Sequence, residues 1–492
     1  MSVIKIENVT FSYPNSYDTV FENLNLQIDT DWKLGLVGRN GRGKTTLLSL
    51  LCGKYEYQGK ISASVSFDYF PYQVADARRQ TAEILQEICP SAPEWMLQRE
   101  FSLLGADQEA LYRPFETLSH GERTKALLAA LFLRSDCFLL IDEPTNHLDA
   151  EARKAVSAYL QKKKGFMLVS HDRSFLDGCV DHILSLNRTG TELQSGNFSS
   201  YLAQFERQQA SEAAQNERLQ KDILRLRRSA ERASSWADQT EASKKGALNS
   251  GLKVDRGYIG HKSAKMMKRA KCIEARRQQA IEEKSQLLKN TETTEALKLT
   301  LPQYHAAQLA AFSDVSVNYG GRTACANISF MIRRRERIAL KGLNGSGKSS
   351  LLKLLAGIPV PHTGTVSIGS GLTVSYVPQD ASGLCGELCS YAKEQKIDIT
   401  LFLTILRKMG FERSLFEKDM SELSGGEKKK VLIAKSLCEK AHLYVWDEPL
   451  NFIDIYSRIQ IERLLQEFSP TMIFAEHDIA FQAAIATKTI CI

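Results

Sequence analysis

The stretch that decides the fold is Gly38-Arg39-Asn40-Gly41-Arg42-Gly43-Lys44-Thr45. An apolar segment, residues 34–37, precedes it, and a helical pattern, residues 46–51, follows it. This strand–loop–helix context is what a phosphate-binding loop requires, because glycines let backbone N–H groups close around phosphate oxygens and the helix N-terminus adds positive potential. We therefore expect Lys44 to reach the β- and γ-phosphates of a nucleotide and the Thr45 hydroxyl to bind Mg²⁺.

The same stretch returns later in the chain together with three further motifs. The four pairs are Gly38–Thr45 with Gly342–Ser349, Leu118-Ser119-His120-Gly121-Glu122 with Leu423-Ser424-Gly425-Gly426-Glu427, Asp142-Glu143-Pro144 with Asp447-Glu448-Pro449, and Ser170-His171-Asp172 with Glu476-His477-Asp478. The offsets between matching residues are 304, 305, 305 and 306. Four motifs in one order at a nearly constant offset indicate a tandem duplication. We expect two α/β nucleotide-binding domains, residues 1–203 and 298–492, joined by a linker, residues 204–297.

Each half ends an apolar, strand-like run with two carboxylates. Residues 138–141 run into Asp142-Glu143, and residues 443–446 run into Asp447-Glu448. A carboxylate at the end of a strand beside a phosphate loop suits Mg²⁺, and the next carboxylate can accept a proton from an attacking water. His171 and His477 each follow a strand-like segment, and their recurrence favours a sensor of the γ-phosphate over a structural histidine.

Composition narrows the class of protein. The chain has 492 residues, 43% hydrophobic and 25% charged, which excludes collagenous, low-complexity and disordered classes. The longest apolar run, residues 126–133, ends at Arg134, well short of the roughly 18 residues of a membrane span. Residues 1–8 show no secretory signal, and the ten scattered cysteines indicate reduced thiols, so we expect a cytoplasmic protein. The CxxxC pair Cys385 and Cys389 has no partner pair nearby, and we expect no metal there.

The phosphate loop, the LSGGE-like signature, Asp-Glu-Pro and the downstream histidine together resemble the ABC ATPases. That resemblance implies a head-to-tail sandwich within one monomeric chain, in which ATP and Mg²⁺ bind between one phosphate loop and the other half's signature. Carried over, site one combines Lys44, Thr45, Asp142, Glu143 and His171 with Ser424 and Gly426, and site two combines Lys348, Ser349, Asp447, Glu448 and His477 with Ser119 and Gly121. The catalytic residues implied are Glu143, Glu448, His171 and His477, and the Mg²⁺ ligands are Thr45, Asp142, Ser349 and Asp447. Further nucleotide contacts implied are Gly38, Asn40, Gly41, Gly43, Thr46, Gly342, Asn344, Gly345, Gly347 and Ser350, with Gln73 and Gln379 as Mg²⁺ sensors and Tyr13 and Tyr319 stacking on adenine.

Two departures from the family pattern concern site two. His120 stands where the signature usually has glycine, and Leu450-Asn451-Phe452-Ile453-Asp454 replaces the pattern Thr145-Asn146-His147-Leu148-Asp149 of the first half. A non-glycine residue at position 120 restricts how closely the backbone approaches the γ-phosphate. Because Glu448 is intact, we predict two functional but unequal sites.

The sequence of the linker predicts a long helical hairpin. Small or apolar residues recur at spacings of 4, 3, 4 and 3 from Leu219 to Ala233, and a gappier stripe runs from Met266 to Leu287. Such spacing places each set on one helical face. Four glycines, from Gly246 to Gly260, interrupt the middle. We expect an antiparallel α-helical hairpin with its tip near residues 246–262, whose first arm, residues 203–237, would be on the order of 50 Å long.

The linker also carries the net charge of the chain. The whole chain has a net charge of +7, and residues 205–296 alone carry 20 Lys or Arg and 13 Asp or Glu. Such a patch binds phosphate backbones by releasing counterions, and interspersed aromatic rings stack on unpaired bases. We therefore expect RNA contacts from Lys244, Lys245, Lys253, Arg256, Tyr258, Lys262, Lys265, Lys268, Arg269 and Lys271.

Two ATPase domains and a long linker, without a membrane domain, resemble the ABC-F family, of which the residues 145–149 pattern is also typical. The phrase Asp31-Trp32-Lys33-Leu34-Gly35, running into the first phosphate loop, and the long linker resemble the Lsa-type antibiotic-resistance branch. The resemblance implies binding at the exit site of the bacterial ribosome, with the linker near the P-site tRNA and the 23S rRNA of the peptidyl-transferase centre. It implies protection from lincosamides, streptogramin A and pleuromutilins.

Two other functions remain open. One is a housekeeping translation factor of the same fold, without a role in resistance. The other is the ATPase subunit of a transporter whose membrane partner is a separate chain. The basic linker opposes the second, because a transporter has no need of it, and we expect no stable membrane partner.

Overall fold

The computed structural model describes residues 2–14, 19–134, 137–145, 148–187, 190–242, 302, 304–320, 322–343, 345–411 and 413–492. Two compact units divide the chain. The first comprises Met1–Tyr201 and Ala296–Ile492, and the second comprises Leu202–Glu295. The predictions for linker residues 243–301, including the tip and the second arm, lie outside the described residues.

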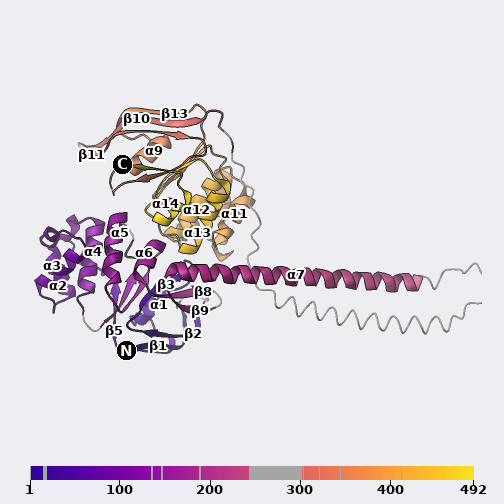
Figure 1. The fold of residues 1–492 in the computed structure, drawn as a ribbon, viewed down its shortest axis with the longest axis horizontal. Helices are drawn as coiled ribbons and strands as arrows, with labels where there is room; N and C mark the ends of the chain where they lie inside the picture. Colours follow the sequence, from indigo (N-terminus) through magenta and orange to yellow (C-terminus); the bar gives the residue numbers. More distant parts are fainter. Residues whose placement is uncertain are drawn as a thin grey trace, which may run out of the picture. The chain divides into compact units, whose positions relative to one another are not determined.

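The N-terminal half is built on a six-stranded sheet of order β5-β6-β7-β3-β8-β9, in which only β9 runs antiparallel to its neighbour (Figure 1). A second, antiparallel sheet has the order β2-β1-β4. The strands are β1 Val3–Ser12, β2 Thr19–Asp29, β3 Lys33–Gly38, β4 Gln58–Ser62, β5 Ser66–Phe70, β6 Cys137–Asp142, β7 Phe166–Val169, β8 His182–Asn187 and β9 Gly190–Ser195. The helices are α1 Lys44–Leu51, α2 Thr81–Ile88, α3 Glu94–Leu103, α4 His120–Leu131, α5 Ala150–Gln161 and α6 Arg173–Cys179, with 3-10 turns η1 Gln108–Tyr112 and η2 Phe115–Thr117.

The C-terminal half repeats this plan, as the duplication predicts. Its parallel sheet has the order β14-β15-β16-β12-β17, and its antiparallel sheet has the order β11-β10-β13. The strands are β10 Gln308–Tyr319, β11 Arg322–Arg333, β12 Arg337–Lys341, β13 His362–Ile368, β14 Val374–Val377, β15 Leu443–Asp447, β16 Met472–Ala475 and β17 Lys488–Cys491. The helices are α9 Lys348–Leu355, α10 Leu388–Glu394, α11 Ile399–Lys408, α12 Gly425–Cys438, α13 Ile455–Phe468 and α14 Ile479–Ile485, with 3-10 turns η4 Arg413–Glu417 and η5 Met420–Glu422.

The central strands are buried on both faces, which explains their continuous apolar sequences. All four residues of β7 and of β16 are buried, and both strands lie between the strand that enters the phosphate loop and the strand that ends in the two carboxylates. Parallel strands bring their carboxyl ends to one edge of a sheet, where α/β folds bind ligands. The fold thus gathers the motifs of each half at one edge.

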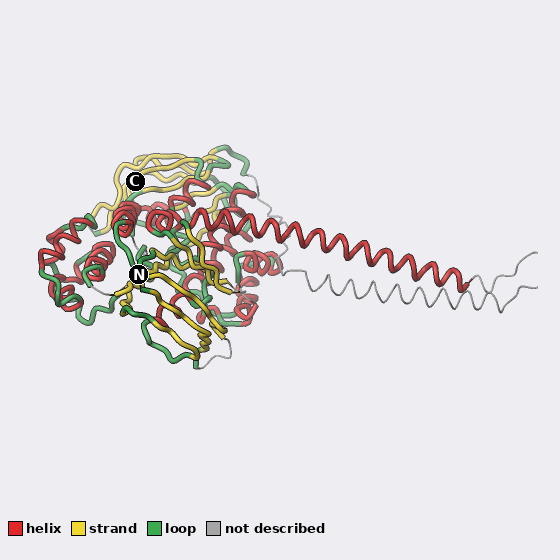
Figure 2. Tube along the Cα trace, turned by 60° about the horizontal axis from the view of Figure 1, so that its bottom comes forward, coloured by secondary structure: helices red, strands yellow, loops and turns green. Residues whose placement is uncertain are grey.

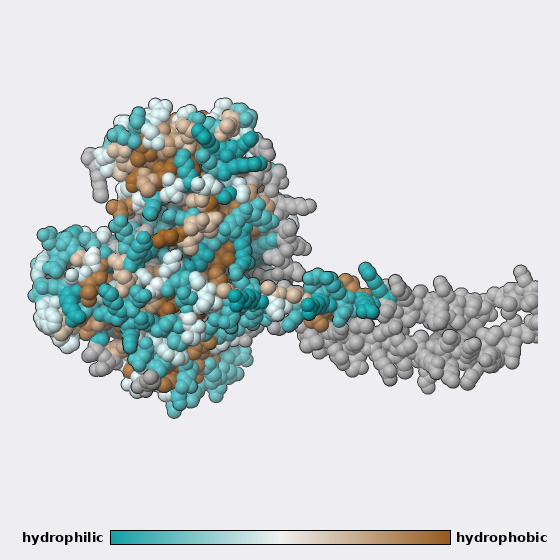
Figure 3. All heavy atoms as spheres, in the orientation of Figure 1, coloured by the Kyte–Doolittle hydropathy of each residue, from teal (hydrophilic) through white to brown (hydrophobic). Residues whose placement is uncertain are grey.

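One helix continues from the N-terminal half into the second unit. Helix α7 spans Phe198–Ala242, 45 residues, on the order of 65 Å (Figures 1 and 2). It begins earlier than the predicted start near residue 203, because the side chain of Asn197 accepts a hydrogen bond from the Ser200 N–H at 3.0 Å and so caps the helix. On the face shown in Figure 3, the described part of α7 is largely hydrophilic.

No helix among the residues that the structure describes combines the length and the apolar composition that a membrane crossing requires.

A buried ion pair fixes the start of α13. Lys430 Nζ on α12 donates to Asp454 Oδ2 at 2.8 Å, and the two side chains are 4% and 0% exposed. The matching lysine of the first half, Lys125, instead donates to the carbonyl of Gly105 at 3.0 Å, near the surface. The pair is therefore peculiar to the C-terminal half.

We predict that Lys430→Met lowers the free energy of unfolding by about 3–5 kcal/mol, because it leaves the Asp454 carboxylate buried without its cation. The matched substitution Lys125→Met should cost no more than about 1.5 kcal/mol, the value of an ordinary hydrogen bond. Urea unfolding followed by fluorescence measures both. Equal losses would show that Asp454 does not depend on Lys430.

Candidate functional site

In each half the ends of three adjacent strands converge. In the N-terminal half, β3 leads into the phosphate loop, β6 ends at Asp142, and β7 is followed by His171, in the spatial order β6-β7-β3. The C-terminal half places β15, β16 and β12 in the same way. Residues 97 or 98 positions apart in the sequence therefore face one another.

The first loop closes around its own lysine. Gly41 and Gly43 adopt φ of 79° and 80°, which only glycine takes without strain. The ammonium of Lys44 donates to the carbonyl oxygens of Gly38 at 2.9 Å and Arg39 at 3.2 Å. Burial lowers the pKa of Lys44, while the charges of Asp454, Glu143 and Asp142 raise it. The loop thus holds a buried cation at the start of a helix, the arrangement that binds phosphate.

The predicted Mg²⁺ ligands of site one lie together. Thr45 Oγ1 donates to Asp142 Oδ2 at 3.0 Å. Tyr69, on β5, donates its hydroxyl to the same oxygen at 3.1 Å. The sequence reasoning missed Tyr69, because nothing in its local pattern distinguishes it from a core aromatic residue.

The next carboxylate, Glu143, faces His171. Glu143 Oε1 lies 3.3 Å from His171 Nε2. The backbone of Glu143 has φ of 49°, a left-handed conformation, and its N–H donates to the carbonyl of Val169 at 2.9 Å. Burial and the neighbouring Asp142 raise the pKa of Glu143 to about 8, and burial lowers the pKa of His171 well below its usual value. Backbone strain and a raised carboxyl pKa are both common where a group acts as a base.

The second loop has the same internal geometry. Gly345 and Gly347 have φ of 82° and 85°. The ammonium of Lys348 donates to the carbonyl oxygens of Gly342 at 2.9 Å and Leu343 at 2.7 Å. Ser349 Oγ donates to Asp447 Oδ1 at 3.0 Å, and burial raises the pKa of Asp447 to about 6.

Three described side chains surround the second carboxylate, Glu448. Its backbone repeats the left-handed conformation, with φ of 44°. Gln379 and Asn451 donate their side-chain amides to Glu448 Oε2 at 2.9 Å and 2.6 Å, and His477 Nε2 lies 3.6 Å from Oε1. Burial alone would raise the pKa of Glu448, but His477, Gln379 and Asn451 together outweigh it and lower the pKa to about 2. The two candidate bases therefore sit in opposite electrostatic environments.

The two glutamines predicted to sense Mg²⁺, Gln73 and Gln379, have different surroundings in the structure. Gln379 contacts Glu448, as described above. Gln73 is exposed, and no hydrogen bond from it to Asp142 or Glu143 is found among the described residues. The extra residue before it, Tyr72, turns inward and donates to Asp68 Oδ2 at 2.5 Å. The role of Gln73 as a Mg²⁺ sensor stays a prediction.

Lys429 is a second residue that sequence reasoning missed. Its ammonium donates to the carbonyl oxygens of Pro378 at 2.8 Å and Glu448 at 3.2 Å. Burial lowers the pKa of Lys429 to about 8, opposed by the charges of Asp447, Glu476 and Glu448. The matching residue of the first half is Thr124, so a difference between the two copies was the available signal.

The side chains present fit Mg²⁺ with a bound nucleotide. Asp447 Oδ2 and Glu143 Oε1 are buried without a hydrogen-bond partner among the described residues. No cluster of three or more His, Cys, Asp or Glu suited to a metal occurs in the described parts of the chain. One carboxylate and one hydroxyl in each site match Mg²⁺, which takes one or two protein ligands and completes its shell with phosphate oxygens and water.

The two candidate adenine platforms are tied to the loops. Tyr13 and Tyr319 are 38% and 47% exposed. Their hydroxyls hydrogen-bond to Thr46 Oγ1 at 2.8 Å and Ser350 Oγ at 2.9 Å, each in the first turn of the helix after a phosphate loop. Each ring is thus held beside its loop with a large part of its surface free to stack.

Site one opens into a cavity of about 470 Å³ lined by both halves. Its walls include Lys44, Thr45, Asp142, Glu143 and His171 from the first half. From the second half it is lined by Ser424, Gly425, Gly426 and Phe452. The first phosphate loop therefore faces the second signature, in the head-to-tail arrangement that the resemblance implies.

The segment 450–454 touches both sites, which corrects the expectation that its departures affect site two alone. Asn451 contacts Glu448 of site two, whereas the carbonyl of Phe452 accepts a hydrogen bond from Asn40 Nδ2 of the first loop at 2.8 Å. Phe452 has φ of 64°, a left-handed conformation that costs about 1–2 kcal/mol outside glycine. Because the turn 450–454 follows closely on the end of strand β15, it places residue 452 next to the phosphate loop of the first half.

The signature helices start in the same way in both halves. Ser119 and Ser424 each accept a hydrogen bond from the backbone N–H three residues on, and Glu122 and Glu427 complete the capping boxes. His120 is the first residue of α4, and its backbone is not left-handed, so this position does not need glycine.

The second signature glycine lies in a narrow space. A Cβ at Gly426 would overlap the Phe452 carbonyl oxygen and lie 2.8 Å from Asn40 Nδ2. Close approach of these groups requires glycine at position 426. The charge of Asp149 acts on Lys348, so the first half also reaches the second loop.

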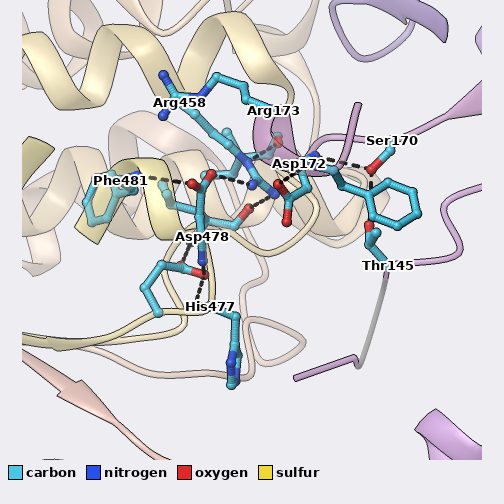
Figure 4. Close-up of polar contacts among 12 residues, drawn as sticks. Thr145, Ser170, Asp172, Arg173, Arg458, His477, Asp478 and Phe481 are labelled. Atoms are coloured by element: carbon cyan, nitrogen blue, oxygen red, sulfur yellow. Dashed lines mark hydrogen bonds and ion pairs between the residues drawn. The ribbon is translucent and has the colours of Figure 1, made fainter. Parts of the chain in front are cut away.

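A buried network of charges joins the two halves beside site one (Figure 4). Arg458 donates to Asp478 at 3.1 Å and to the carbonyl oxygens of Ile453 and Leu450, both at 2.9 Å. Arg173 of the first half pairs with Glu462 of α13, with 3.1 Å between Nη1 and Oε2. Arg458 therefore clamps both ends of the turn that reaches the first loop.

The predicted RNA contacts, Lys244, Lys245, Lys253, Arg256, Tyr258, Lys262, Lys265, Lys268, Arg269 and Lys271, lie outside the described residues. The same holds for Asn344 of the second loop.

Known proteins resemble the whole chain. The ribosome protection protein VmlR of Bacillus subtilis is 27% identical over 97% of this chain and 84% of its own length. The energy-dependent translational throttle protein EttA of Haemophilus influenzae is 26% identical over 95% of this chain and 88% of its own length. The archaeal ribosome recycling factor aABCE1, solved in complex with the ribosomal stalk protein aP1, shares the fold with a TM-score of 0.64 at 19% identity, over 98% of this chain and 87% of that chain.

The model of the ABC transporter family matches residues 21–146 and 325–451, which together are more than half of the chain. The chain therefore belongs to the ABC transporter family and is an ATPase.

Proposed function

We propose that the protein hydrolyses ATP on the bacterial ribosome and protects it from antibiotics. In this proposal it acts in the cytoplasm as a monomer, and its linker reaches toward the P-site tRNA and the 23S rRNA of the peptidyl-transferase centre, near the exit site. The drugs relieved are lincosamides, streptogramin A and pleuromutilins. The observation that carries the proposal is a 45-residue helix that continues directly out of a tandem ATPase. The full-length likeness to VmlR supports the same assignment.

The geometry supports hydrolysis in both sites. Lys44 and Lys348 would hold the β- and γ-phosphates, and Tyr13 and Tyr319 the base. Bound Mg²⁺, held by Thr45 with Asp142 or by Ser349 with Asp447, supplies charge neutralisation for phosphate oxygens.

The candidate bases would take a proton from the attacking water. Glu143 and Glu448 are assigned this role, with His171 and His477 orienting the γ-phosphate. ATP draws the opposite signature onto the loop, and hydrolysis releases it. Ser424 and Gly426 serve site one in this scheme, and Ser119 and Gly121 serve site two.

The composition of the linker supports an RNA partner. Residues 221–277 hold 16 basic and 6 acidic side chains. A patch of this density binds phosphate backbones without sequence specificity. A transporter ATPase would have no use for it, and we therefore do not favour that function.

A second candidate is a housekeeping translation factor of the same fold. The likeness to EttA over 95% of this chain favours it. The two candidates share ATP hydrolysis and ribosome binding and differ only in whether drug-treated ribosomes recover, so a resistance assay distinguishes them.

The opposite environments of the two bases predict different pH profiles. In a Glu448→Gln variant only site one hydrolyses, and its rate should rise roughly fivefold between pH 7 and pH 8, because deprotonation of Glu143 supplies the base. In a Glu143→Gln variant the rate should be nearly flat over this range, because Glu448 is already ionised. Phosphate release at saturating ATP measures both, and identical profiles would refute the assigned difference.

Removing both bases should trap the protein on ribosomes. The double variant Glu143→Gln, Glu448→Gln closes on ATP but loses about 10²- to 10⁴-fold in turnover, so it should accumulate in the ribosome pellet with ATP. Lys44→Met with Lys348→Met provides the control, because it lacks the phosphate-binding cations and should stay in the supernatant. A double Glu→Gln variant that remains in the supernatant with ATP would contradict ATP-dependent binding.

The central functional test is expression in a drug-sensitive bacterium. The wild-type chain should raise the inhibitory concentrations of a lincosamide, a pleuromutilin and streptogramin A, and the double Glu→Gln variant should not.

Replacing Lys262, Lys265 and Lys268 by Gln should abolish protection, because these charges bind RNA in the proposal. The matched triple change at Lys5, Lys60 and Lys488, exposed on the ATPase domains, should leave protection intact. No protection by the wild-type chain, with ribosome binding retained, would favour the housekeeping factor.

A further inference from the structure

Three hydroxyl groups meet in the protein interior where α7 begins. Tyr201 lies on α7, Ser185 on β8 and Tyr456 on α13, and they are 2%, 0% and 9% exposed. The Tyr201 hydroxyl donates to Ser185 Oγ at 2.9 Å and lies 2.7 Å from the Tyr456 hydroxyl. The Tyr456 hydroxyl also lies 3.4 Å from Ser185 Oγ, and because each hydroxyl has one proton to donate, Tyr456 is the donor to Tyr201 or to Ser185. Ser185 in turn donates to Asn187 Oδ1 at 3.1 Å, which completes a directional chain.

The base of α7 is anchored on the N-terminal half independently of this chain. Phe198 is fully buried, and its ring packs against that of Tyr201 with centroids 6.0 Å apart. The Ser199 N–H donates to Asp177 Oδ1 at 2.7 Å. Removing a hydroxyl from the chain would therefore leave the helix attached to the first half.

The donor end belongs to the segment that touches the first phosphate loop. Tyr456 follows Phe452, whose carbonyl accepts from Asn40, by only four residues. Asp454, between them, caps α13 and is paired with Lys430. When the turn 450–454 moves relative to the first phosphate loop, Tyr456 therefore moves with it, because the turn leads directly into the rigid start of α13.

We propose that the hydroxyl chain Tyr456–Tyr201–Ser185 couples the closure of site one to the orientation of α7. When the first loop and the turn 450–454 are drawn together, Tyr456 meets Tyr201 and fixes the direction in which α7 leaves the ATPase. When they separate, the bond is lost and α7 is held by the first half alone. A helix on the order of 65 Å converts a small change at Tyr201 into a large displacement at its far end. The proposal rests on the proposed function only in naming the linker as the part that acts.

The test measures two distances by fluorescence transfer in the full-length chain, with labels on non-natural amino acids so that the native cysteines remain. The pair Lys154 and Glu394 reports closure of the two halves, and the pair Gln220 and Glu394 reports the direction of α7. In the double Glu143→Gln, Glu448→Gln background, ATP should shorten the first distance and narrow the distribution of the second. Adding Tyr456→Phe, or separately Tyr201→Phe, should abolish the narrowing while the first distance still shortens.

Tyr444→Phe is the matched control, because Tyr444 is equally buried and donates to the carbonyl of Glu439 at 2.9 Å, away from the chain. In the double Glu→Gln background, this variant should still show the shortening of the first distance and the narrowing of the second distribution with ATP. Narrowing that persists in both Tyr456→Phe and Tyr201→Phe would overturn the proposal, and so would loss of closure in these variants, which would make the hydroxyls part of the domain interface alone. The measurement needs no ribosome, so failure of the proposed function leaves its outcome unaffected.

Discussion

The geometry of the tandem ATPase depends on the contact between the first phosphate loop and the turn 450–454. Asn40 reaches the carbonyl of Phe452, and the turn accepts a left-handed backbone at a phenylalanine to present that carbonyl. Such strain persists only where the surroundings hold it. Arg458 supplies this support by bonding both ends of the turn, and Lys430 fixes Asp454 at its exit.

The same turn also contacts the carboxylate of its own half. Asn451, together with His477 and Gln379, lowers the pKa of Glu448, and the matching residue of the first half, Asn146, lies outside the described residues. The inserted Tyr72 donates to Asp68, and Tyr69 donates to the oxygen of Asp142. The two copies keep the loops and carboxylates, while the pKa of Glu143 is raised and that of Glu448 is lowered.

The sequence predicted those parts of the protein that repeat. The phosphate loops, the strand-end carboxylates and the histidines lie where their motifs indicated, because parallel strands must bring their ends to one edge. Tyr69 was missed because its local pattern resembles that of a core aromatic residue, and Lys429 because the first half has Thr124 at the matching position. The role of Phe452 at site one was misassigned, since a motif's place in the chain does not reveal which half its backbone will face. The start of α7 was placed too late because an asparagine cap extends the helix beyond its apolar stripe.

These features describe a tandem ATPase from which a long helix continues, and the central claim is that this helix acts on the ribosome. The rate of ATP hydrolysis with and without purified bacterial ribosomes tests that claim most directly. Ribosomes should increase the turnover of the wild-type chain, and the increase should fall steeply with added salt because the contacts are to phosphate groups. A rate that does not change with ribosomes at low salt would contradict the account.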